Sequence, residues 1–276
     1  MGNAACGASL LAADSVDIGE GAMLLKTMPA RTGTCVVVGS SSGIGLAIAR
    51  RLALEGRRVA MLARRADVLE VQAGLVNDAV GKPLAHPYEH DAADTAAAEP
   101  LFARIERELG EVDELHYVAG VMPEVGAEEY DLAKDAEQMQ VNALGCIAWV
   151  NAAVRRFHER RKGCIVGISS VAQDRGRTGR PGYNASKASM DTFLESIRNR
   201  VWTRGVQVTT IRPGFVETPM TAALQLRGAI SADRAAELIL RARDARKTIA
   251  YVPWRWRPIM FVIRNIPSVV FRHMTV

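Results

Sequence analysis

The sequence has little of what a metal centre or a disulfide framework needs. Its four cysteines form no C-x-x-C pair, and its five histidines form no H-E-x-x-H motif. Thiolate zinc sites and metalloprotease centres are built from such closely spaced pairs. We therefore predict a protein without a metal site, whose cysteines stay reduced in the cytoplasm. These cysteines are Cys6, Cys35, Cys146 and Cys164.

Long apolar runs are also missing. A helix that spans a bilayer needs about 20 apolar residues, and the longest apolar run near the C-terminus, Ile259 to Ile263, is far shorter. The first residues show no basic leader before an apolar core, so they do not resemble a secretion signal. We expect residues 1–30 to be an extension without regular structure, because ordered apolar patterning begins only after Met28.

Acidic residues are nearly absent from the C-terminal part. Residues 241–276 hold eight basic side chains and one acid, Asp244, although the whole chain carries a net charge of only +5. The rest of the chain is therefore slightly acidic, which argues against nucleic acid as a partner. Residues 254–276 mix Trp, Arg and short apolar runs. We expect this segment to pack on the body, on a partner subunit or on a membrane surface.

Short apolar strands alternate with amphipathic helices along the rest of the chain. Residues 34–38 are a β-branched run typical of a buried strand, and the alternation continues to a last strand over 248–252. One long helix is predicted over 132–161. Pro100 falls inside another, over 95–109, so that helix either begins near Glu99 or bends there.

Seven strands joined by helices define the fold class. The pattern predicts α/β architecture, with one doubly wound Rossmann-type domain over residues 31–253. Its sheet would be seven-stranded and mostly parallel, with helices on both faces.

A glycine-rich loop joins the first predicted strand to the first helix. It reads Val38-Gly-Ser-Ser-Ser-Gly-Ile-Gly45, with the spacing G-x-x-x-G-x-G. Glycines allow a tight turn there and let backbone N–H groups approach a phosphate at the N-terminus of the helix. The strand–loop–helix context favours a dinucleotide site over an ordinary turn.

The end of the second predicted strand indicates which dinucleotide binds. Sites that prefer NAD usually place an acid there, but this strand ends at Ala63 and is followed by Arg64 and Arg65. A guanidinium binds the 2′-phosphate that an acid would repel. We therefore favour NADP(H), with NAD(H) as the alternative. The alternative interpretation is that the two arginines are ordinary solvated charges at the surface.

Three polar residues follow the strand predicted over 164–169. Ser170 closes that strand, and Tyr183 and Lys187 lie four apart on the next helix, where they share one face. A lysine ammonium beside a phenol lowers the phenol pKa, which is normally about 10. Such a tyrosine can act as a general acid or base near neutral pH. A tyrosine and a lysine at this spacing also occur by chance as a surface pair.

Together the glycine loop, Ser170, Tyr183 and Lys187 resemble the short-chain dehydrogenase/reductase family, over residues 34–253. The resemblance implies that Tyr183 is the general acid/base, that Lys187 binds the nicotinamide ribose, and that Ser170 holds the substrate oxygen. It implies that Asn142 supports a water-linked proton relay and that Asp91 contacts the adenine. The expected cofactor-binding residues are Gly39, Ser41, Ser42, Gly43, Ile44, Gly45, Arg64, Arg65, Asp91, Ala119, Gly120, Tyr183, Lys187, Pro213, Gly214, Val216 and Thr218.

Two segments depart from the family pattern. Val38 stands where the family often has Thr, so a side-chain hydrogen bond is lost. The segment Tyr117-Val-Ala-Gly120 stands where the family has Asn-Asn-Ala-Gly, whose asparagines steady the central sheet. We expect altered local stability rather than altered chemistry, because Ala119 and Gly120 still leave room for the cofactor.

The resemblance implies an NAD(P)-dependent oxidoreductase acting on CH–OH and C=O groups. Hydride would pass between the cofactor and a carbonyl carbon while Tyr183 exchanges a proton with the oxygen. The expected partners are a small carbonyl or alcohol and further copies of the chain, in a cytoplasmic homodimer or homotetramer with peripheral membrane contact as an open alternative. The competing function is a non-catalytic NADP(H)-binding sensor, or a membrane-associated scaffold, on the same fold.

Three arginines stand between Ser170 and Tyr183 among several glycines. They form either a basic lip for an anionic substrate, such as a phosphate or an acyl-carrier thioester, or a loop of solvated side chains. We favour the solvated loop. These residues are Arg175, Arg177 and Arg180.

Overall fold

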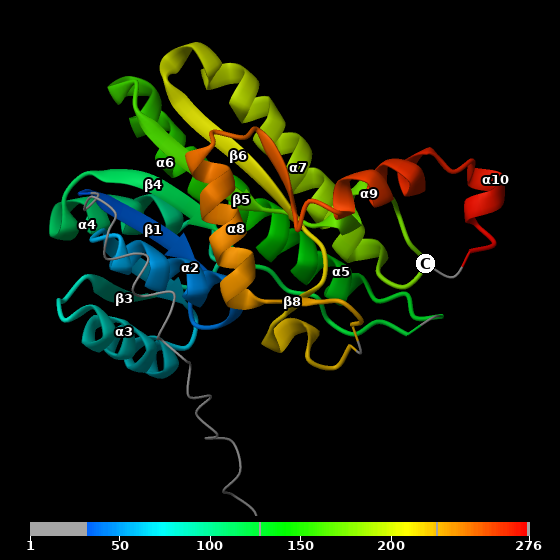
Figure 1. The fold of residues 1–276 in the computed structure, drawn as a ribbon, viewed down its shortest axis with the longest axis horizontal. Coiled ribbons are helices and arrows are strands. Elements are labelled where there is room, and N and C mark those ends of the chain that lie inside the picture. The colour runs from blue at the N-terminus through cyan, green and yellow to red at the C-terminus, as the bar shows by residue number, and fades with distance from the viewer. Residues whose placement is uncertain (1–31, 127, 225, 275–276) are drawn as a thin grey trace, which may run out of the picture.

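A seven-stranded sheet forms the centre of the computed structural model, which describes residues 32–126, 128–224 and 226–274 (Figure 1). The strand order is β3-β2-β1-β4-β5-β6-β9, and every neighbouring pair is parallel. The predicted doubly wound fold is thereby confirmed, whereas the extension expected over 1–30 lies outside the described residues. The strands are β1 (Thr34–Val38), β2 (Arg58–Ala63), β3 (Ala85–Glu89), β4 (Val112–Tyr117), β5 (Gly163–Ile168), β6 (Val206–Pro213) and β9 (Ile249–Val252).

Helices cover both faces of this sheet (Figure 1). Alternate residues of a strand point to opposite faces, so Val36 and Val38 of β1 join one core cluster while Cys35 and Val37 join the other. The first cluster packs against α4 (Ala98–Leu109), α6 (Cys146–Arg160) and α7 (Pro181–Val201). The second packs against α2 (Gly43–Leu54), α3 (Ala66–Val80) and α8 (Ala232–Asp244).

The strand order reverses between β1 and β4, which places a crevice at their carboxyl ends. The chain leaving β4 stays attached to β1 there, because the backbone N–H groups of Val118 and Ala119 both donate to the carbonyl of Val38, at 2.9 and 2.8 Å. The glycine loop after β1 and the segment after β4 therefore face each other across this crevice.

The helix predicted over 132–161 is not continuous. It begins as α5 (Leu132–Gln138), widens into a π-helix, η1 (Met139–Gly145), and continues as α6. A π-helix winds one extra residue into a turn and often lies at a functional site. The helix predicted over 95–109 begins at Ala98, so Pro100 stands in its first turn.

Smaller elements complete the description. The 3₁₀ helices are η2 (Val171–Asp174), η3 (Trp202–Arg204) and η4 (Pro219–Thr221), and β7 (Val216–Glu217) pairs with β8 (Ile230–Ser231). Two C-terminal helices, α9 (Trp256–Asn265) and α10 (Ser268–Phe271), extend away from the sheet (Figure 1). Within the described part of the chain, no helix is both long and apolar enough to cross a bilayer.

Candidate active site

A cavity of about 440 Å³ opens at the carboxyl ends of the central strands. Every residue predicted to bind the cofactor lines this cavity, and so does Ser170. Of the four predicted catalytic residues, only Asn142 is not part of the wall, because it is fully buried behind it. The fold thus brings together residues from Gly39 to Thr218 that the sequence keeps far apart.

Close backbone contacts shape the glycine-loop end of the cavity. Gly39 adopts a left-handed φ of 90°, and a Cβ there would lie 2.6 Å from the backbone nitrogen of Ala119. A Cβ on Gly45 would lie 2.0 Å from the carbonyl oxygen of Gly39. Ser42 precedes α2 and its side chain makes no capping bond to the first turn of that helix. Backbone N–H groups of that turn therefore remain suited to a bound anion.

Two cations flank this loop. Arg64 and Arg65 are both exposed, and the Arg65 Nη2 lies 3.4 Å from the Ser41 Oγ, to which it donates. No carboxylate of the described chain forms an ion pair with either guanidinium. Both arginines line the cavity beside the glycine loop.

His90 is a wall residue that the sequence reasoning missed. It is buried, and its Nε2 accepts a hydrogen bond of 2.9 Å from the indole Nε1 of Trp149. Because Nε2 accepts this bond, the neutral ring carries its proton on Nδ1, and burial favours that neutral form by lowering the pKa of His90. Asp91 follows it, and its Oδ1 accepts from the backbone N–H of Ala93 at 2.9 Å. The only signal for His90 in the sequence was its position before Asp91.

Ser170, Tyr183 and Lys187 meet at the other end of the cavity. Ser170 precedes η2, where its Oγ accepts from the backbone N–H of Ala172 at 3.0 Å. Tyr183 and Lys187 lie on the first two turns of α7, with the Lys187 Nζ 5.8 Å from the centre of the Tyr183 ring. The Lys187 Nζ donates to the carbonyl of Ile168 at 2.9 Å.

Burial governs the proton affinities of this pair. Burial raises the pKa of Tyr183; the Ser170 side chain and the charge of Arg180 lower it by less, so the phenol pKa is raised. Burial also lowers the pKa of Lys187 to about 8. In the protein without ligands, burial thus outweighs the groups that lower the pKa of Tyr183, and the expected lowering by Lys187 stays a prediction.

Asn142 lies in the π-helix, and its side chain makes three hydrogen bonds. Its Oδ1 accepts from the backbone N–H of Val121 at 2.7 Å, and its Nδ2 donates to the Val121 carbonyl and to the Ser186 Oγ, both at 3.0 Å. The side chain therefore ties the loop after β4 to α7. The proton relay that the resemblance implies for Asn142 stays a prediction.

Tyr117 replaces an asparagine of the family pattern and makes a different bond. Its hydroxyl is buried and donates to the backbone carbonyl of Val141, at 2.5 Å. Gly145 leaves the space for this phenol, since a Cβ there would lie 2.4 Å from the Tyr117 Oη. The substitution thus fixes the end of β4 to the π-helix that carries Asn142.

The arginines between Ser170 and Tyr183 do not form a solvated loop. The Arg175 guanidinium donates to the carbonyls of Ile263 and Arg264, each at 3.1 Å, and to that of Ile266. It also lies 4.0 Å above the Phe271 ring. The favoured interpretation is therefore wrong for Arg175, which holds the end of α9.

The other two arginines of this loop are half-buried as well. The Arg177 Nη2 lies 3.9 Å from the Met260 sulfur, so this residue also contacts α9. Only Arg180 directs its charge toward Tyr183. None of the three arginines is among the residues that line the cavity, so a basic lip for an anionic substrate stays a prediction.

The described residues contain no group of three or more His, Cys, Asp or Glu side chains that could hold a metal ion. His86 and His90 stand four apart, but they lie along β3 and its end, where that spacing separates them by about 13 Å. The absence of a metal site stays a prediction.

Comparison with known proteins identifies the family. Residues 33–227 match the family model described as short chain dehydrogenase. An uncharacterized oxidoreductase of Mycobacterium tuberculosis (strain ATCC 25618 / H37Rv) is 30% identical over 240 residues, which are 87% of this chain and 96% of that protein. The 3-oxoacyl-(acyl-carrier-protein) reductase of Bos taurus is 31% identical over 188 residues, 68% of this chain and 77% of that protein.

A solved structure shares the fold. It is a short-chain dehydrogenase from Sphingobium yanoikuyae in complex with NADPH, similar with a TM-score of 0.75 at 22% identity, over 86% of this chain and 97% of that one. The fold and the cavity define a dinucleotide-fold protein with a tyrosine–lysine pair at its strand ends. The chain belongs to the short-chain dehydrogenase/reductase family and is an enzyme of that family.

Proposed function

We propose that this enzyme interconverts a carbonyl and a primary or secondary alcohol by hydride transfer, with NADP(H) as cofactor and Tyr183 as general acid/base. The observation that carries the proposal is that one and the same cavity is lined by the glycine loop at one end and by Ser170, Tyr183 and Lys187 at the other. A sensor or scaffold needs the first end only. The intact second end therefore favours catalysis over that alternative.

The cavity fits a dinucleotide on its own geometry. The cradle made by Gly39 and Gly45 admits no Cβ, so it leaves backbone room for a pyrophosphate at the start of α2. Arg64 and Arg65 favour a 2′-phosphate, and the similar Sphingobium yanoikuyae enzyme is in complex with NADPH. We therefore favour NADP(H), with NAD(H) as the alternative.

The proposed chemistry assigns the proton to the protein. When bound, NADPH supplies the hydride to the carbonyl carbon. Tyr183 holds its proton at neutral pH because burial raises its pKa, and it donates that proton to the carbonyl oxygen as the alcohol forms. Ser170, which lines the same cavity as Tyr183, holds that oxygen in place.

Lys187 supports this step with its charge. Its pKa of about 8 keeps most molecules protonated at neutral pH, so a positive charge stands near the phenolate that remains on Tyr183. We assign the same ammonium to the nicotinamide ribose, as the family resemblance implies. Location in the cytoplasm and assembly into a homodimer or homotetramer stay predictions of the sequence.

A cofactor titration with three proteins tests the proposal. Wild type, Tyr183→Phe and the exposed control Tyr130→Phe are titrated with NADPH and NADH. NADPH oxidation is then followed with ketones, aldehydes and 3-oxoacyl thioesters. We expect all three to bind NADPH more tightly than NADH, and Tyr183→Phe alone to lose about 10²–10⁴-fold in turnover. Undiminished turnover by Tyr183→Phe, or no nucleotide binding by wild type, would overturn the proposal.

A double variant and a matched control test the preference for NADPH over NADH. Arg64→Ser/Arg65→Ser removes the two cations beside the glycine loop, and Arg200→Ser/Arg204→Ser removes two exposed cations elsewhere. The first pair is expected to weaken NADPH binding by about tenfold or more and to leave NADH binding unchanged. Equal losses for both nucleotides would contradict the preference.

A further inference from the structure

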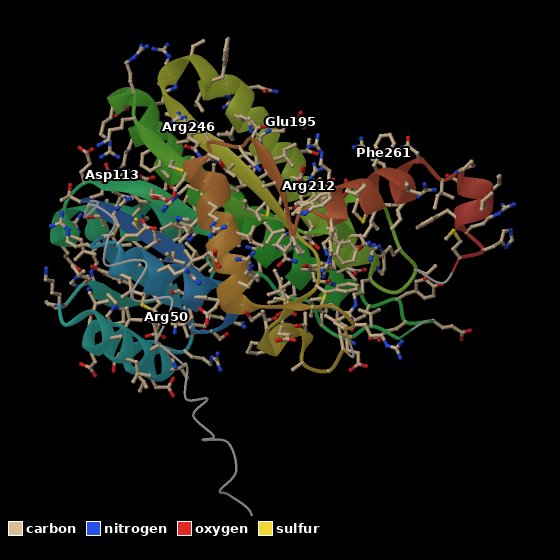
Figure 2. All side chains as sticks on the ribbon, viewed as in Figure 1. Arg50, Asp113, Glu195, Arg212, Arg246 and Phe261 are labelled. Atoms are coloured by element: carbon tan, nitrogen blue, oxygen red, sulfur yellow. The ribbon has the colours of Figure 1, made fainter. Side chains whose placement is uncertain are left out.

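The C-terminal helices carry a large exposed apolar area. Trp254 is 77% exposed, Phe261 71% and Val262 63%, whereas most apolar side chains of comparable size lie in the core. Figure 2 shows Phe261 on α9, at the margin of the molecule. The name tail surface is used below for the exposed side chains over residues 254–274. It includes Trp254, Arg257, Ile259, Phe261, Val262, Arg264, Val269, Val270 and Arg272.

Packing on the body accounts for only one side of α9. Trp256, Met260 and Ile263 follow the helical spacing i, i+4, i+7, and they form the face turned to the protein, where Met260 is 1% exposed. Phe261 and Val262 lie on the opposite side and touch no core. An amphipathic helix that served the body alone would place polar residues there.

The positive charge of the tail surface indicates the kind of partner that it binds. Residues 254–274 contain four arginines and no acid. No carboxylate in the described chain forms an ion pair with any of the four. A second copy docking through a twofold axis would bring this surface against itself, and therefore arginines against arginines. A partner with negative charge and an apolar interior fits both features.

We propose that the tail surface docks on bilayers that contain anionic phospholipids. Trp254, Phe261 and Val262 would enter the boundary between headgroups and acyl chains, where tryptophan and apolar side chains are favoured. Arg257 and Arg264 follow each other by two turns at the edge of the apolar side of α9, where their heads can reach the phosphates. The helix would lie in the plane of the surface without crossing it.

The docked surface has a fixed relation to the cavity. The Trp256 ring packs edge-on against Phe215, with ring centres 4.8 Å apart, and a Cβ on Gly214 would meet the Trp256 indole. Arg175 binds the carbonyls at the end of α9 from the loop that follows Ser170. Both ends of α9 are therefore attached to segments that carry wall residues, so a bound bilayer would lie beside the cavity.

Vesicle sedimentation of the full chain without cofactor tests this proposal independently of the enzymatic one. The probes are phosphatidylcholine vesicles with and without phosphatidylserine. Phe261→Ser/Val262→Ser removes apolar contact and is matched by Val71→Ser/Leu75→Ser on α3, which changes two exposed apolar residues elsewhere. Arg257→Glu/Arg264→Glu reverses charge and is matched by Arg200→Glu/Arg204→Glu. Circular dichroism and thermal unfolding establish that each variant is folded.

We expect wild type to sediment with the anionic vesicles only, less so as salt is added. Both tail variants should bind at least about tenfold more weakly, because each loses two contacts with the interface, and both controls should bind as wild type does. No sedimentation of wild type at low salt overturns the proposal, as does equal binding by tail variants and controls. It is also overturned if the tail variants lose self-association in ultracentrifugation and wild type ignores vesicles, which would make the surface a subunit interface.

Discussion

Two buried cations at opposite ends of the sheet are held in opposite ways. Lys187, at the carboxyl ends of the strands, is 4% exposed, and its ammonium donates to the carbonyl of Ile168. No carboxylate of the described chain pairs with it. Burial therefore lowers its pKa to about 8.

Arg243, near the amino ends of the strands, is 3% exposed and surrounded by acids. Its guanidinium lies 3.2 Å from Glu55, 3.2 Å from Glu114 and 2.9 Å from Asp244. Burial lowers the pKa of Arg243, but the combined carboxylates outweigh it and raise that pKa. The pKa of Glu114 is in turn held well below its usual range, because the neighbouring positive groups outweigh its burial.

The difference separates a structural charge from a functional one. A buried charge with its counter-ions is satisfied by the protein and fixes the packing around it. A buried charge without them costs folding free energy and keeps its interaction for a ligand or a reacting group. The two ends of the same sheet are thus built for stability and for chemistry, respectively.

Replacing Lys187 gives the largest expected effect. Lys187→Met removes the charge beside Tyr183, and kcat/KM for NADPH-dependent carbonyl reduction should fall by about 10²–10⁴-fold while the protein stays folded. Lys162→Met, which removes an exposed lysine, serves as the control. Activity within about tenfold of wild type would show that the charge of Lys187 is not used.

Replacing Arg243 should act on stability instead. Arg243→Met removes the cation that Glu55 and Glu114 share and leaves Arg57 beside Glu114 alone, so the free energy of unfolding should fall by about 3–5 kcal/mol in urea denaturation. Arg241→Met breaks an exposed ion pair with Glu237 and should cost less than about 1 kcal/mol. If the two variants were equally stable, the Arg243 cluster would contribute nothing beyond a surface pair.

The stability of Lys187→Met should depend on pH. The folded pKa of Lys187 lies below that of the unfolded chain, so its charge destabilises the native state fully below about pH 8 and no longer above about pH 10.5. The variant should therefore be more stable than wild type by about 2–3 kcal/mol at pH 7, and this gain should vanish as the pH rises. Unfolding midpoints of both proteins measured between pH 7 and about pH 10.5 test this prediction. A stability gain of the variant that does not vary with pH would show that it comes from packing and not from the lost charge.

The smallest change keeps the charge of Arg243 and alters its shape. Arg243→Lys places a point charge where a planar fork contacted several carboxylates, and we expect a loss of about 1–2 kcal/mol. Stability equal to wild type would mean that charge alone, without geometry, holds the cluster. Thermal unfolding of the two proteins at neutral pH makes the measurement.

The sequence was sufficient for the fold and for many residues of the cavity wall, because these depend on local patterns. The G-x-x-x-G-x-G loop between a strand and a helix, and the four-residue spacing of Tyr183 and Lys187, are visible without a structure. Parallel strands then place their carboxyl ends together, which is why predicted residues from distant segments line one cavity.

What sequence reasoning missed depends on contacts between distant residues. Trp149 bonds to His90 across 59 positions, and Arg175 bonds to Ile263 across 88. Helix and strand periodicity relates residues a few positions apart, so it predicts neither pair. The raised pKa of Tyr183 likewise reflects how deeply α7 is covered, which a list of neighbouring charges could not supply.

The π-helix over Met139–Gly145 has a consequence at the level of the gene. Removal of one codon within it would let the chain return to regular α-helical bonding, so the deletion would look harmless to local hydrogen bonding. It would nevertheless change the direction in which the remaining side chains of this segment point, because each residue of an α-helix turns the chain by about 100°. The additional residue of the π-helix therefore sets the direction in which the Asn142 side chain points toward Val121.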